Sequence, residues 1–135
     1  MKIGIIGVGF VGGATIEVLK TKHKVFPYDK YKKPYNTPEN LKALATKSEI
    51  IFICVPTPMK PSGEIDYSAI HNSLATLKTE VDRAKRDPQE ILITIRSTAV
   101  SGTTDKLAEE YPFRFAFNPE FLKERRALED TKNTD

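Results

Sequence analysis

The feature that most constrains this sequence is a run of glycines close to its beginning. An apolar segment, Ile3–Ile6, precedes glycines at positions 7, 9 and 12, which have the spacing G-x-G-x-x-G. We interpret the segment as a buried strand, the glycines as a turn, and Phe10 as the start of a helix. Gly7 permits the tight turn, Gly9 lets a pyrophosphate approach the backbone, and Gly12 lets the helix pack close to the strand. A bound pyrophosphate then lies at the positive end of the helix dipole.

A second predicted strand follows this helix and ends in an acidic residue, Asp29. Asp29 lies seventeen residues after the last glycine, near the separation of about 20 expected for a carboxylate that binds the adenosine ribose. The predicted helix also places Val11, Ala14 and Val18 on one face. A glycine turn without a ligand is the alternative interpretation of the motif alone. The strand, helix and carboxylate around it favour a dinucleotide.

The rest of the chain alternates predicted strands and helices, which is typical of a parallel sheet with helices on both faces. The predicted strands are residues 3–6, 25–28, 50–55, 91–95 and 113–117. Five helices are predicted, and the first begins at Phe10. The next three are indicated by apolar residues at helical spacing: Leu41, Leu44 and Ala45 in the second, Ile70, Leu74, Leu77 and Val81 in the third, and Leu107 and Ala108 in the fourth. The fifth is predicted at residues 121–128. The strand 50–55 is apolar throughout, so we expect helices to cover both of its faces. The predicted fold class is α/β, a Rossmann-type doubly wound sheet of about five strands.

We interpret residues 1–135 as one dinucleotide-binding domain. Five strands are one fewer than in the full dinucleotide-binding fold, whose strand order is 3-2-1-4-5-6. The chain is accordingly expected to stop before a sixth strand, or to leave its fifth strand as an edge of the sheet.

Composition excludes several classes of protein. The net charge of +3 is too small to indicate a nucleic-acid-binding protein, and no apolar run approaches the ~20 residues of a membrane helix. Neither His23 nor His71 has a cysteine or carboxylate partner at metal-binding spacing, so we expect no metal site. The single cysteine, Cys54, excludes an internal disulfide and indicates a cytoplasmic location. Whether the chain forms a homo-oligomer is left open.

Four predicted strands end in polar or proline-containing segments. Asp29 ends the second strand, and Val55-Pro56-Thr57-Pro58 ends the third. The fourth ends in Arg96-Ser97-Thr98, and the fifth in Asn118-Pro119-Glu120. Because ligands bind outside the carboxyl ends of parallel strands, we expect these four segments to face one crevice.

Together these segments resemble the N-terminal domain of the UDP-glucose/GDP-mannose dehydrogenase family, and most closely its members that oxidise UDP-glucose. The resemblance runs from Met1 to about Asp130 and rests on residues 7–12, Phe52–Pro58, Ser97–Thr104 and Phe117–Glu124. The last segment is the most specific, since members that act on N-acetylated sugars tend to lack its Asn-Pro-Glu-Phe run. The family oxidises the C6 alcohol of a nucleotide sugar to a carboxylate, using NAD twice and a thioester on a cysteine.

The resemblance implies roles for individual residues of these segments. Glu120 would orient or activate the hydrolytic water and Thr98 would line the cofactor and water site, so these two are the expected catalytic residues. NAD would be bound by Gly7, Gly9, Phe10, Val11, Gly12, Asp29, Lys30, Val55, Pro56, Thr57, Ser97, Thr98 and Glu124. The nucleotide-sugar substrate would contact Glu120, Phe121, Leu122 and Lys123.

The family's nucleophilic cysteine lies in a later domain, together with its lysine and asparagine partners. Cys54 is no substitute, because it is predicted to lie in an apolar strand, where a thiol is a small buried hydrophobe. The chain also departs from the family's usual prolines at Val100 and Ser101, and from a frequent glycine at Arg125. We therefore do not expect the chain alone to complete the oxidation. The alternatives are a nucleotide-binding or assembly module without catalysis, and a two-domain dehydrogenase of hydroxy acids.

Overall fold

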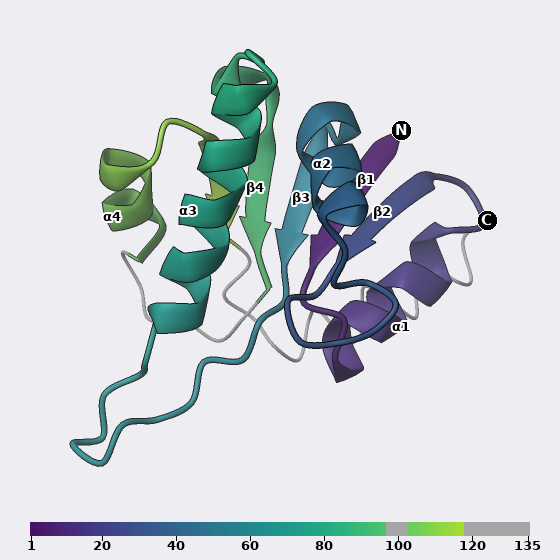
Figure 1. The fold of residues 1–135 in the computed structure, drawn as a ribbon. Helices are drawn as coiled ribbons and strands as arrows, with labels where there is room; N and C mark the ends of the chain where they lie inside the picture. The colour runs from purple at the N-terminus through teal and green to yellow at the C-terminus, as the bar shows by residue number, and fades with distance from the viewer. Residues whose placement is uncertain (97–102, 118–135) are drawn as a thin grey trace.

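A five-stranded parallel sheet forms the centre of the structure, a computed structural model that describes residues 1–96 and 103–117. Its strands are β1 (Lys2–Ile6), β2 (Lys24–Tyr28), β3 (Ile50–Ile53), β4 (Leu92–Ile95) and β5 (Arg114–Phe117). All neighbouring strands are parallel, so their carboxyl ends lie at one edge of the sheet (Figure 1). The α/β class predicted from the sequence is confirmed.

The strands lie in the order β2-β1-β3-β4-β5. In the order 3-2-1-4-5-6 the third strand lies outside the second, whereas here β3 pairs directly with β1. The observed order is the other common doubly wound arrangement. Its topological switch point, where such sheets bind ligands, lies between the carboxyl ends of β1 and β3. β2 is an edge strand, a position that tolerates its Pro27, which has no N–H to donate.

Helices connect the strands: α1 (Phe10–Leu19), α2 (Pro38–Lys47), α3 (Ser68–Arg83) and α4 (Thr103–Glu110), with a 3-10 turn, η1 (Pro88–Glu90), before β4. Figure 1 shows α2 and α3 over one face of the sheet. The helix α1 packs on β1 and β2. It covers the opposite face, because the β1–β2 and β2–β3 crossovers run in opposite directions and both are right-handed. Among the described helices, none has the length and apolarity needed to cross a bilayer.

One face of α3 forms the middle of the core. Its four apolar residues recur every three to four positions, as predicted, and all are fully buried: Ile70, Leu74, Leu77 and Val81. They share a cluster with the buried isoleucines of the central strands, Ile51, Ile53, Ile93 and Ile95. Burying one such side chain contributes roughly 1.5–3 kcal/mol to stability. This helix therefore fixes the face of the sheet on which the β3–β4 crossover lies.

The buried face of α1 is not the predicted one. Gly12 and Thr15 are buried, whereas Ala14 is exposed and Val11 and Val18 are half-buried. The hydroxyl of Thr15 donates a hydrogen bond to the carbonyl of Val11 (2.8 Å), so its burial leaves no unpaired polar group. Small residues thus bring this helix close to the sheet, and its larger apolar residues point elsewhere.

The prediction that helices cover both faces of β3 is confirmed for the face towards α3. Ile51 and Ile53 are fully buried on the α3 side, but Ile50 and Phe52 are only half-buried. Alternate side chains of a strand face opposite sides, and on this second side α1 packs on β1 and β2. In α4, Leu107 is buried but Ala108 is exposed. The predicted helix at 121–128 lies outside the described residues.

Polar residues start α2 and α3. The hydroxyl oxygen of Thr37, the N-cap of α2, accepts the N–H of Asn40 (3.1 Å). Before α3, the carboxylate of Asp66 accepts the backbone N–H of Ser68 (2.9 Å), although Tyr67 occupies the N-cap position. Hydrogen bonds from the hydroxyl of Ser68 and from its N–H lower the pKa of Asp66. Asp66 therefore supports the start of α3 although it lies one residue before the N-cap position.

Truncation of the buried face of α3 tests this core. We expect Leu74→Ala to lower the free energy of unfolding by about 2–5 kcal/mol, because it leaves a cavity among fully buried side chains. Thr79→Ala, on the exposed side of the same helix, should change it by less than about 0.5 kcal/mol. Urea denaturation followed by circular dichroism measures both. Equal effects of the two substitutions would contradict the assignment of the core.

Candidate dinucleotide-binding site

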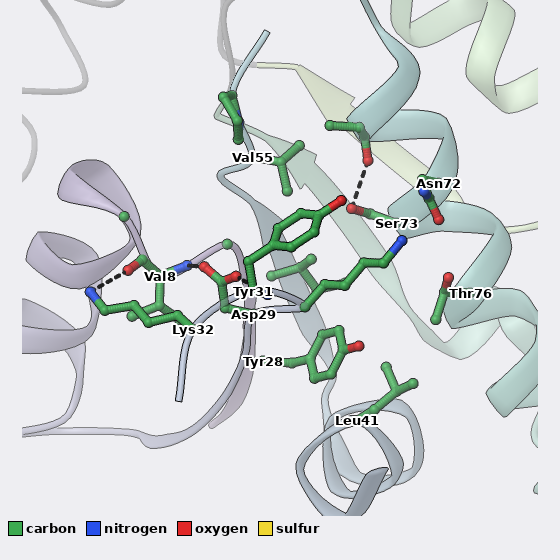
Figure 2. A pocket seen from close by; sticks show the side chains of 16 residues that line it. Val8, Tyr28, Asp29, Tyr31, Lys32, Leu41, Val55, Asn72, Ser73 and Thr76 are labelled. Carbon is green, nitrogen blue, oxygen red and sulfur yellow. Dashed lines mark hydrogen bonds between the residues drawn. The ribbon is translucent and has the colours of Figure 1, made fainter. Parts of the chain in front are cut away.

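A cavity of about 340 Å³ lies at the carboxyl ends of β1, β2 and β3. Its walls come from the end of β1 and the glycine turn, from residues 28–32 after β2, from Val55 and Pro56 after β3, and from the first half of α3. Figure 2 shows these segments surrounding a common space. The volume falls in the range of small-molecule sites, and the position is the switch point of the sheet.

Two glycines of the turn are required by its shape. Gly7 has a φ of +96°, and a Cβ at this position would lie 2.8 Å from the carbonyl carbon of Cys54. A Cβ on Gly12 would lie 1.8 Å from the carbonyl oxygen of Gly7. The roles predicted for both glycines, a tight turn and close packing of the helix, are confirmed. The first turn of α1 can meet the end of β1 only because these side chains are absent.

Gly9, in contrast, borders open space. A Cβ on Gly9 would meet no protein atom within 4 Å, and Gly9 lines the cavity. Gly9 is also the N-cap of α1, which begins without a side-chain cap and has no acidic residue in its first turn. The first N–H groups of a helix have no partner inside it and lie at the positive end of its dipole. An approachable backbone at such a helix start is the arrangement that binds phosphate groups.

Asp29 holds the glycine turn in place (Figure 2). Its Oδ2 accepts the N–H of Val8 at 2.8 Å, and its Oδ1 accepts the N–H of Tyr31 at 2.9 Å. The ammonium group of Lys32 donates to the carbonyl of Val8 at 2.9 Å. Two charged side chains from the segment after β2 therefore hold both polar groups of Val8. Because a carboxylate has about four acceptor sites, Asp29 can still accept hydrogen bonds from a ligand.

Tyr28 contributes a neutral hydroxyl to the same cavity. Its burial raises its pKa above the ordinary value, and the nearby charges of Asp29 and Glu80 raise this pKa further. The phenol consequently stays protonated at neutral pH. It can donate a hydrogen bond to a ligand without adding negative charge beside Asp29.

The wall formed by α3 was not predicted from the sequence. Ala69, Ser73 and Thr76 line the cavity from one side of the helix, and Asn72 lies beside them. The hydroxyl of Ser73 donates to the carbonyl of Ala69 (2.8 Å). The available signal is a row of small and polar residues at helical spacing, next to the buried row that contains Leu74. Val8, Tyr28, Tyr31 and Lys32 also line the cavity without having been predicted.

The structure places the predicted residues in three groups. Gly7, Gly9, Asp29, Lys30, Val55 and Pro56 line the cavity. Phe10, Val11, Gly12 and Thr57 do not line it, and Phe10 is 94% exposed. Ser97, Thr98, Glu120, Phe121, Leu122, Lys123 and Glu124 lie outside the described residues. The first three strand ends therefore meet at one cavity, and the contribution of the fourth and fifth strand ends stays a prediction.

Cys54 lies beside the glycine turn and not inside a strand, because β3 ends at Ile53. It is half-buried, and its N–H donates to the carbonyl of Ile6 (2.8 Å). A Cβ on Gly12 would lie 3.5 Å from its Cβ. The prediction of a thiol within the apolar strand was wrong, and the backbone of Cys54 instead packs against the turn.

Comparison with known proteins decides the family. The model of the UDP-glucose/GDP-mannose dehydrogenase family, NAD binding domain, matches residues 31–135. The chain belongs to this family. Both the family and the NAD cofactor predicted from the sequence are thereby confirmed. The match begins after Asp29. The assignment of the glycine turn and of Asp29 to the cofactor site therefore depends on the structure and not on this match.

This NAD-binding domain is similar to the first part of longer enzymes. A UDP-glucose 6-dehydrogenase of Rickettsia typhi is 26% identical over 164 residues, which cover 96% of this chain and 36% of the relative. A GDP-mannose 6-dehydrogenase of Pseudomonas aeruginosa is 28% identical over 171 residues, which cover 96% of this chain and 38% of the relative. The chain thus spans less than two fifths of the length of these relatives.

Solved structures of similar enzymes share the fold. A GDP-mannose dehydrogenase from Pseudomonas aeruginosa matches with a TM-score of 0.62 and 24% identity, over 87% of this chain and 35% of that protein. A UDP-glucose dehydrogenase from the archaeon Pyrobaculum islandicum matches with a TM-score of 0.61 and 20% identity, over 86% of this chain and 34% of that protein. At these identities the likeness establishes the fold.

Neighbouring glycines offer a matched test of the turn. We expect Gly12→Ala to lower the free energy of unfolding by about 3 kcal/mol or more, because its Cβ overlaps the carbonyl of Gly7. Gly13→Ala should raise it by roughly 0.5–1 kcal/mol, since a Cβ there meets nothing within 4 Å and alanine favours the helix. Thermal unfolding of both variants is the measurement. A Gly12→Ala variant as stable as Gly13→Ala would contradict the observed packing.

Proposed function

We propose that this chain is the NAD-binding domain of a dehydrogenase that oxidises the C6 alcohol of UDP-glucose to a carboxylate. The observation that carries the proposal is the open backbone at Gly9, which lies in the same cavity as Asp29. The substrate is supported by relatives named UDP-glucose 6-dehydrogenase, among them that of Rickettsia bellii, 32% identical over 88 residues, which cover 62% of this chain and 19% of the relative.

The residues of the cavity fit the parts of a dinucleotide. The backbone at Gly9 and the first N–H groups of α1 would hold the pyrophosphate, because no Cβ separates them from the cavity. Asp29 would accept hydrogen bonds from the hydroxyls of the adenosine ribose, with Val8 and Tyr31 fixing the carboxylate. NAD, when bound, supplies the acceptor for the hydride that leaves C6. The domain's task is to bind and orient it.

The catalytic part of the proposal depends on residues beyond this cavity. Glu120 would orient or activate the hydrolytic water beside Thr98, and Lys123 would contact the nucleotide sugar. The nucleophilic cysteine is expected in a later domain of a longer protein, since Cys54 packs against the glycine turn. We further propose that the nucleotide sugar binds between this domain and those parts, and that the protein is cytoplasmic.

The alternative function is a nucleotide-binding module without catalysis. Both functions use the same cofactor site, so cofactor binding does not separate them. They differ in whether NAD becomes reduced when UDP-glucose is added to the full-length gene product. Reduction supports the dehydrogenase, and bound but unreduced NAD supports the module.

Removal of the open backbone tests the pyrophosphate site. We expect Gly9→Ala to fold with unchanged stability, since its Cβ meets no protein atom, but to weaken NADH binding by about ten- to a hundredfold. That loss corresponds to one or more charge-assisted hydrogen bonds at the helix start. Gly13→Ala, with equal open space but no place in the cavity lining, is the control and should bind like the wild type. Equal binding by all three proteins, measured by calorimetry, would refute the site.

The charge of Asp29 should select NAD over NADP. A 2′-phosphate about 4 Å from this carboxylate is repelled by roughly 1–4 kcal/mol, which is about fivefold to a thousandfold in affinity. We expect Asp29→Asn to abolish most of this preference. The ratio of the dissociation constants of NADPH and NADH is the quantity to measure, because loosening of the turn affects both alike. An unchanged ratio in Asp29→Asn would show that Asp29 does not face the ribose.

A further inference from the structure

Tyr31 is 85% exposed although it lines the cavity. Its backbone is held, because its N–H donates to Oδ1 of Asp29 at 2.9 Å. The ammonium group of Lys30 lies over the ring of Tyr31, 5.5 Å from its centroid, and the 85% exposure of the side chain leaves ring surface accessible to a partner. A fixed backbone that carries an exposed aromatic ring at the mouth of a cavity is suited to closing over a flat ligand.

The wall across from this ring is lined by small side chains. Ala69, Ser73 and Thr76 come from one side of α3, and none is larger than a threonine. In Figure 2 the ring of Tyr31 projects into the space between Asp29 and these residues. Ser73 uses its hydroxyl proton within the helix, so towards the cavity its hydroxyl oxygen can only accept a hydrogen bond. Such a slot, with a ring on one side and small residues on the other, suits an aromatic base.

Two polar side chains at the slot are free to form hydrogen bonds with the edge of a base. The side chains of Asn72 and Thr76 line the cavity, and neither has a hydrogen-bond partner among the residues that the structure describes. An amide both donates and accepts, as does a hydroxyl, so together they match the mixed donor and acceptor edge of adenine.

The connectivity of a dinucleotide fixes which of its parts reaches this slot. Its base is bonded to the same ribose whose hydroxyls Asp29 would bind, and Tyr31 follows Asp29 by two residues. The pyrophosphate, at Gly9, continues from the other end of that ribose. The adenine is therefore the part of the ligand that lies beside Tyr31 and α3, and the nicotinamide extends away from them.

We infer that Tyr31 is a base-stacking residue, which closes over the adenine and presses it against Ala69, Ser73 and Thr76 of α3. This inference rests on the proposed function, since it assigns a residue to the same cofactor site. The ring, and not the hydroxyl, is the group that matters. The side chain is exposed in the free protein, so its contribution is to cofactor affinity and not to folding.

The test compares variants that keep or remove the ring. Tyr31→Phe, Tyr31→Leu and a control, Met59→Ala, are titrated calorimetrically with NADH, ADP-ribose and AMP. Met59 is 72% exposed and does not line the cavity. We expect Tyr31→Leu to raise the dissociation constants of all three ligands by one common factor, on the order of tenfold, as for loss of a stacked base. Tyr31→Phe and Met59→Ala should remain within about twofold of the wild type, and all thermal midpoints should coincide.

Each other outcome has a definite meaning. If the wild type binds NADH and Tyr31→Leu binds all three ligands equally well, stacking is refuted and the proposed function stands. If Tyr31→Phe loses as much affinity as Tyr31→Leu, the hydroxyl and not the ring is responsible, and the inference fails. If the folded wild type binds neither NADH nor ADP-ribose, the proposed function fails and the inference falls with it.

Discussion

The contact between Gly12 and the carbonyl of Gly7 sets the geometry on which the site depends. With 1.8 Å between that oxygen and the place of a Cβ, only glycine allows α1 to start directly at the end of β1. The positive φ of Gly7 turns the chain within the same few residues. Because β1 lies beside β3 at the switch point, this turn delivers the first N–H groups of α1 to the edge where parallel sheets bind ligands.

The segment after β2 then fixes the turn through charge. Asp29 accepts the N–H of Val8 while Lys32 donates to the carbonyl of Val8, so the two successive peptide groups on either side of this residue are both held. Hydrogen bonds to charged groups are the stronger ones, at about 1.5–3 kcal/mol each. A turn held in this way gives up little conformational freedom when a ligand binds, which increases affinity. Asp29 is therefore part of the scaffold of the turn, and in our proposal also a ligand of the ribose.

The sequence predicted those features of the fold that depend on large apolar side chains or on glycine. The apolar row of α3, the glycine roles and the strand positions were predicted because large side chains, or their complete absence, impose them. The buried face of α1 was missed because Gly12 and Thr15, both small, make that contact, while the more apolar Val11 and Val18 are only half-buried. The strand order could not be predicted, because the connections alone allow β3 to lie on either side of the β1–β2 pair.

The residues of the candidate site likewise fall into those that the sequence predicted and those that it did not. Gly9 and Asp29 belong to one short motif, so their proximity could be predicted. Ala69 and Thr76 lie some forty residues later, and α3 reaches the cavity only because the β2–β3 connection places β3, the strand before α3, beside β1. Their small side chains give only a weak signal, a row at helical spacing, whose role becomes clear once the fold is known. Tyr31 stands among lysines, a sequence setting typical of the surface, and the hydrogen bond from its N–H to Asp29 holds its backbone at the cavity mouth.

The central claim is that one cavity, at the carboxyl ends of β1, β2 and β3, binds the dinucleotide through its backbone at Gly9. The most direct measurement is a titration of the isotopically labelled chain with ADP-ribose, followed through its backbone amide resonances. We expect the largest shifts at the amides of Val8, Gly9 and Tyr31, a further shift at Thr76 across the cavity, and none in α4. Saturable binding that shifts α4 and leaves Gly9 and Tyr31 unchanged would contradict it.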